Sequence, residues 1–86
     1  MREVRELIER LENRAEEDEQ CAANNARVVE LLDPEMKLFD AREAPWNTYV
    51  VRMAVDHRSS ERRDRRYAAD LREAVAILRA KEQETR

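Results

Sequence analysis

Apolar residues recur at steps of three and four through the first third of the chain, which predicts an amphipathic helix over residues 2–32. The stripe consists of Val4, Leu7, Ile8, Leu11, Ala15, Cys21, Ala22, Val28, Val29 and Leu32. A heptad frame that starts at Val4 gives the seam positions Val4, Leu7, Leu11, Arg14, Asp18, Cys21, Asn25, Val28 and Leu32. This predicted seam is apolar at both ends and polar in the middle.

Two prolines predict where the helices end. Proline disfavours helix at the residue before it and suits the first position of a new helix, so Asp33-Pro34 predicts a stop and a restart. A short helix over 34–42 would then bury Met36, Leu38 or Phe39. Pro45-Trp46-Asn47 predicts the second break, with Asn47 or Thr48 as the cap of the next helix.

The last segment, residues 48–81, again favours a helix. Its apolar face consists of Val50, Met53, Ala54, His57, Tyr67, Ala68, Leu71, Ala74, Val75 and Leu78, with a polar stretch around residues 57–64. The alternation of residues 48–56 also fits a strand, because β-branched residues are frequent there. Residues 36–56 could then form a short β-hairpin, but a lone two-stranded sheet is marginal and no glycine is present to form its turn.

The two long helices match each other when they run antiparallel. With Leu32 near Thr48, the polar middles coincide: Asp18 lies near Arg62 and Arg63, Arg14 near Asp64 and Arg66, and Asn25 near Val55 and His57. We therefore predict one all-α domain over residues 1–86, an antiparallel helical hairpin with a short intervening helix. Its polar seam consists of Arg14, Asp18, Asn25, His57 and Asp64. A polar layer of this kind fixes register at some expense of stability.

A bare hairpin buries only one side of each helix, so we expect dimerisation or docking on a partner to complete the core. Apolar side chains gather near the turn: Leu38, Phe39, Trp46 and Tyr49. Either the short middle helix covers them or they serve as anchors for a protein partner.

Composition supports few turns and long helices, because the 86 residues include no glycine and 43% of them are charged. Residues 1–51 hold 13 acidic and 7 basic side chains, whereas residues 52–86 hold 7 and 10. The basic excess includes an arginine stripe on the last helix: Arg58, Arg62, Arg65, Arg66 and Arg72. We expect these arginines to be solvated or paired with acidic residues of the same chain. If they are free, such a stripe suits an acidic protein surface or phosphates, although the interleaved acidic residues oppose nucleic acid.

Chemistry is sparse in this sequence. One histidine and one cysteine, His57 and Cys21, lie about one turn apart across the predicted seam, without a phosphate-binding loop or a zinc motif. We therefore expect no enzyme activity, no cofactor, no metal and no small-molecule substrate. A single cysteine, a charged N-terminus and the lack of a long apolar run lead us to expect a cytoplasmic protein without a signal peptide or membrane contact.

The favoured function is that of a non-enzymatic protein-interaction module, an adaptor or inhibitor that docks on another protein or on itself as a homodimer. Small, highly charged chains of this size occur among phage-encoded inhibitors and adaptors, an analogy of size alone. The alternative is a nucleic-acid-binding regulator that uses the arginine stripe.

Overall fold

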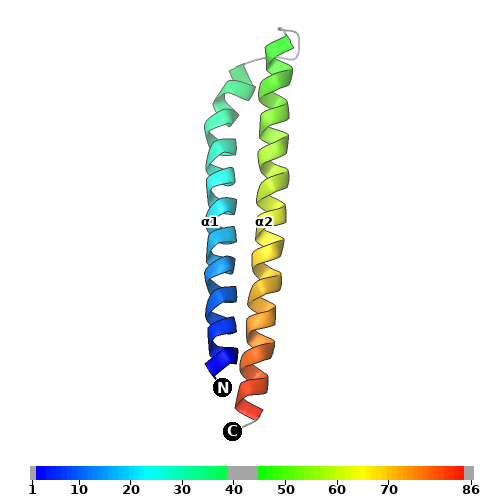
Figure 1. Cartoon of the computed structure of the whole chain (residues 1–86). Coiled ribbons are helices and arrows are strands. Elements are labelled where there is room, and N and C mark those ends of the chain that lie inside the picture. Colours follow the sequence, from blue (N-terminus) through cyan, green and yellow to red (C-terminus); the bar gives the residue numbers. More distant parts are fainter. Residues whose placement is uncertain (1, 39–44, 85–86) are drawn as a thin grey trace.

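The computed structural model describes residues 2–38 and 45–84, with side chains described for residues 2–33 and 50–84. Two helices make up this part, α1 (Arg2–Leu38) and α2 (Pro45–Glu84). They lie antiparallel and side by side, so that the start of α1 and the end of α2 share one end of the molecule (Figure 1). The hairpin is a rod that measures 66 × 16 × 14 Å. The prediction of an all-α hairpin of two long helices is confirmed.

The first predicted break was wrong, because α1 continues through Asp33-Pro34 to Leu38. A proline inside a helix removes one backbone hydrogen bond and strains the preceding turn, which favours an end without enforcing one. Of the short helix predicted over 34–42, residues 34–38 thus belong to α1, and 39–44 lie outside the described residues.

The second helix begins earlier than predicted, at Pro45, and ends at Glu84. Proline at the first helical position has the fixed φ that a helix needs and lacks only an N–H that would have no partner there. Asn47 and Thr48 therefore lie inside the first turn and are not caps. Residues 48–56 are helical, so the alternative of a β-hairpin over 36–56 was wrong for the part that the structure describes.

The faces that the helices turn toward each other follow a strict heptad pattern, with steps of three and four in alternation. The seam positions, all buried or half-buried, are Val4, Ile8, Leu11, Ala15, Asp18, Ala22, Asn25, Val29 and Leu32 on α1, and Val50, Ala54, His57, Glu61, Asp64, Ala68, Leu71, Val75, Leu78 and Glu82 on α2. We call these two rows the seam.

Every second position of the predicted α1 frame was off by one residue. Leu7, Arg14 and Cys21 are exposed, and the seam holds the residues that follow them: Ile8, Ala15 and Ala22. Adjacent apolar residues such as Leu7 and Ile8 fit either frame equally well. The pair Arg14-Ala15 distinguishes the observed frame from the predicted one, because Ala15 is completely buried and the Arg14 side chain reaches solvent.

Alanine dominates the most buried seam positions. Ala15, Ala22, Ala54 and Ala68 are each 2% exposed or less, and the larger buried apolar residues are Ile8 and Val75. Small side chains at a helix contact permit a short interaxial distance, which explains the narrow cross-section of the rod. The core is consequently thin, and its packing leaves little room for larger side chains.

The helices are displaced along each other by more than one turn relative to the predicted register. Asn25 contacts His57 as expected, but it also contacts Asp64, one heptad further along α2. Asp18 lies beside Tyr67 and Leu71, whereas Arg62 and Arg63 were expected there. The displacement follows in part from the late end of α1 and the early start of α2, which move the turn along the chain.

Candidate functional site

A hydrogen-bonded polar cluster interrupts the apolar seam near its middle. The side-chain oxygen of Asn25 accepts a hydrogen bond from Nδ1 of His57 at 2.7 Å. The Asn25 amide nitrogen donates to Asp64 Oδ2 at 3.3 Å and to the backbone oxygen of Cys21 at 3.0 Å. Asn25 thereby links α1 to two residues of α2 that lie about two helical turns apart. Since any shift of one helix along the other would break these bonds, the cluster fixes the register.

Two aspartates occupy the seam beside this cluster. Asp18 is 8% exposed and Asp64 is 9% exposed. Each lies 3.6 Å from the Nε of an arginine on its own helix, Arg14 for Asp18 and Arg63 for Asp64. One heptad from Asn25 and His57 along the two helices leads to Asp18 and Asp64, so the two carboxylates belong to the next layer of the same register. The seam thus holds acidic groups where an apolar pair would be more stabilising.

Ion pairs connect the two helices along one side of the seam. Arg5 Nε lies 3.2 Å from Glu82 Oε1, Arg72 bonds to Glu19 at 2.6 Å, and Arg79 pairs with Glu12. We call this side the ion-pair flank; it includes Arg5, Glu12 and Glu19 on α1 and Arg58, Arg65, Arg72 and Arg79 on α2. The hydrogen bond and the negative charge of Glu19 raise the pKa of Arg72, so this guanidinium stays charged.

The predicted arginine stripe is divided between two environments. Arg65 pairs with Glu61 on its own helix, at 2.9 Å, and Arg72 pairs with Glu19 on α1. Arg58, Arg62 and Arg66 are exposed and form no ion pair within the described part of the chain. Two of the five arginines are therefore already engaged by carboxylates of this chain.

The opposite side of the seam is largely apolar. The residues that directly precede every second seam position line it, and the apolar ones are Leu7, Cys21 and Val28 on α1, and Met53, Tyr67 and Ala74 on α2; Arg14 and Ser60 interrupt the two rows. We call the six apolar residues the apolar flank. Leu7 is 37% exposed and Tyr67 is 51% exposed, and Cys21 carries a free thiol that reaches the surface. Along each helix they are seven or fourteen residues apart, and this heptad spacing is typical of a helix-packing face.

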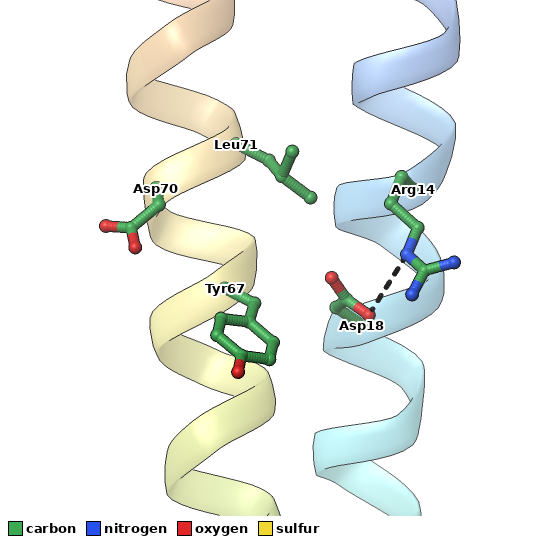
Figure 2. Close-up of a pocket in the computed structure, with 5 residues that line it drawn as sticks. All are labelled: Arg14, Asp18, Tyr67, Asp70 and Leu71. Carbon is green, nitrogen blue, oxygen red and sulfur yellow. Dashed lines mark ion pairs between the residues drawn. The ribbon is translucent and has the colours of Figure 1, made fainter.

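A shallow groove lies in the middle of the apolar flank. Its lining residues are Arg14, Asp18, Tyr67, Asp70 and Leu71. Tyr67 and Leu71 point from α2 toward α1, while Asp70 points away from α1 and Arg14 lies on the other side, beside Asp18 (Figure 2). The groove therefore has Tyr67, Leu71 and the Asp18 carboxylate between a cationic edge on α1 and an anionic edge on α2.

The anchors predicted near the turn lie where the structure gives no side-chain detail. Phe39 is outside the described residues, and Leu38, Trp46 and Tyr49 are placed only as helical backbone. Cys21 and His57 do not face each other, because Cys21 opens to solvent on the apolar flank and His57 bonds to Asn25 in the seam. Among the described side chains that could carry chemistry, His57 thus contacts Asn25, and Asn25 in turn contacts Asp64.

The apolar flank is the feature that the sequence frame missed. Leu7, Cys21 and Val28 were assigned to the seam, and their place beside it becomes evident only when the residues that follow them, Ile8, Ala22 and Val29, are placed inside it. A signal was present in the sequence, because a seam with Arg14 at its centre is less favourable than one with Ala15 there.

Neither described helix is apolar enough over a sufficient length to cross a bilayer, and no group of three or more metal-ligating side chains converges among the residues that were placed. No family model, curated protein or solved structure matches this chain. Its class is defined by the fold alone: an antiparallel helical hairpin with one charged flank and one apolar flank.

Proposed function

We propose that this chain is a non-enzymatic protein-interaction module that packs its apolar flank against helices of another polypeptide. The observation that supports this function most is the row of apolar side chains beside the seam, at intervals of seven or fourteen residues, in which Leu7 and Tyr67 are exposed. Apolar side chains at this spacing bury well only against another helix. An adaptor or an inhibitor acts by such docking.

The two flanks differ in the way a docking module requires. On the ion-pair flank three arginines pair with glutamates of the other helix, as Arg79 does with Glu12, and this side suits contact with solvent. On the apolar flank, contact with water is unfavourable by about 25 cal/mol for each Å² of apolar surface. Association through the apolar flank therefore gains free energy that association through the other flank does not.

The test compares two double variants that each remove two exposed apolar side chains. Leu7→Ser with Tyr67→Ser changes the apolar flank, and Val51→Ser with Val55→Ser changes exposed valines elsewhere on α2. The tagged wild type and each tagged variant are used to pull down proteins from extracts of cells that produce the untagged chain. The retained proteins can then include untagged copies of this chain. Circular dichroism first checks that all three have the same helix content.

We expect the wild type and the valine variant to retain the same proteins and the apolar-flank variant to lose them. Equal retention by all three proteins would contradict the proposed docking surface. If the wild type retains no protein and does not self-associate, the proposed function is wrong.

A nucleic-acid-binding regulator is the second candidate, supported by the exposed and unpaired Arg58, Arg62 and Arg66 in the described part of the chain. If these arginines contact phosphates, the binding constant should fall steeply between 50 and 200 mM salt. Its logarithm decreases by about 0.9 for each phosphate contact when the salt concentration rises tenfold. Fluorescence anisotropy with a labelled 20-base-pair duplex measures this, with Arg62→Gln and Arg66→Gln as the variants. Binding that is absent at 50 mM salt, or that ignores both substitutions, would exclude this candidate.

A further inference from the structure

The groove in the apolar flank has edges of opposite charge. Arg14 on α1 and Asp70 on α2 line it at the same level, with Tyr67 and Leu71 between them (Figure 2). Asp70 is exposed and has no ion pair among the described residues. Arg14 makes one long contact, 3.6 Å from its Nε to Asp18 Oδ1, and its side chain remains 67% exposed. Both charges are therefore available to a surface that carries the same two charges in the opposite order.

A second copy of this chain is such a surface. A two-fold axis that runs parallel to the rod, over the centre of the apolar flank, places α1 of each copy on α2 of the other at the same level. Arg14 then faces the partner's Asp70, and Asp70 faces the partner's Arg14. A two-fold axis across the rod would instead place α1 on α1 and would not bring these two charges together. The charge arrangement thus selects both the occupant and the axis.

We propose that two copies of this chain associate through their apolar flanks into a four-helix bundle with their turns at the same end, held in register by two Arg14–Asp70 pairs. This inference rests on the proposed function, since it names the partner of the same surface. Each α1 packs antiparallel on the partner's α2, as in other bundles with short connections. The exposed side chains of Leu7 and Tyr67 become part of a shared core.

The length of the rod gives room for a stable dimer. A dimer in contact along the whole 66 Å of the rod, over a width of about 10 Å, the diameter of a helix, buries about 660 Å² of each copy. The total of about 1,300 Å² lies within the range of specific protein interfaces. A core that contains mainly alanine leaves the isolated hairpin thinly packed, and the second hairpin supplies the missing layer.

The test reverses one charge at a time. We expect light scattering after size exclusion to give twice the chain mass of 10.3 kDa for the wild type. Arg14→Glu or Asp70→Arg should each weaken the dimer at least tenfold, because each creates two pairs of like charges. An equimolar mixture of the two variants should recover an affinity within about threefold of the wild type, because every pair in the mixed dimer has opposite charges. Arg27→Glu and Glu73→Arg, reversals on the outer faces of the helices, are the matched controls.

Each outcome has a definite meaning. A wild type that is monomeric at 100 µM overturns the dimer, and this result holds even if a variant fails to fold. A dimer that both reversals leave unchanged overturns the choice of face, and a mixture that does not recover overturns the Arg14–Asp70 pairing. A monomeric wild type that still retains another protein through Leu7 and Tyr67 would overturn this inference and leave the proposed function intact.

Discussion

Asn25 on α1 and His57 on α2 meet across the seam, where the Asn25 side-chain oxygen lies 2.7 Å from His57 Nδ1. Asn25 also donates to Asp64, so one amide side chain serves two partners on the other helix. The sequence predicts this contact correctly, and the contact provides the most direct test of the seam.

Asn25→Leu should destabilise the hairpin by about 1–3 kcal/mol, because His57 and Asp64 lose a hydrogen-bond partner in a partly buried place. Adding His57→Leu should recover at least half of this loss, since two facing leucines replace a polar pair. Urea denaturation measures both. Asn24→Leu, at an exposed neighbouring position, is the control with a change below about 0.5 kcal/mol. A double variant less stable than Asn25→Leu alone would contradict the proposed role of the cluster.

Enlarging a seam alanine should destabilise the hairpin. Ala15 and Ala22 are 0% and 1% exposed, and an added isopropyl group there forces the helices apart. Overpacking of this kind costs about 1–3 kcal/mol. Thermal unfolding of Ala22→Leu should therefore show a clear decrease in Tm, whereas Ala23→Leu, on the exposed surface, should change it little. Equal effects of the two substitutions would mean that the seam does not include Ala22.

The cross-helix pairs of the ion-pair flank should contribute little and should depend on salt. Arg72→Gln breaks the bond to Glu19 and is expected to lower Tm by no more than about 3 °C in low salt. In 1 M salt the Debye length falls to about 3 Å and the difference should shrink further. Glu17→Gln, which removes a carboxylate without an ion pair in the described part, is the control. A large loss that persists in 1 M salt would show that Arg72 acts by packing.

Pro34→Ala should stabilise the chain, because α1 continues through this position to Leu38. Alanine restores a backbone N–H to the helix and removes a clash that together cost up to about 3 kcal/mol. Urea denaturation and the helical signal in circular dichroism should both increase. A decrease in stability would instead indicate that a proline-specific turn begins there.

The sequence predicts the fold better than the surfaces. Heptad spacing is sufficient for two long helices and for their antiparallel match, and Asp18, Asn25, His57 and Asp64 all lie in the seam where the pattern puts them. The frame of the intervening positions was wrong because Leu7-Ile8 and Cys21-Ala22 offer two apolar residues in succession. Which member of such a pair is buried depends on how closely the two helices approach each other. The alanines at the helix contact set this distance, and the pattern of apolar residues alone does not reveal it.

The order in which the hairpin forms depends on the antiparallel arrangement. Asn25 and His57 are 32 residues apart in the chain, whereas Arg5 and Glu82 are 77 apart. Closing the longer loop directly costs about 0.8 kcal/mol more in chain entropy. Once the central contact has formed, each further helical turn packs against a neighbour that is already close, so its additional entropy cost is small. We therefore expect the hairpin to zip from the polar cluster toward the free ends of the helices, and to fray from those ends first. In hydrogen exchange, amides near Arg5 and Glu82 should lose their protons well before those near Asn25.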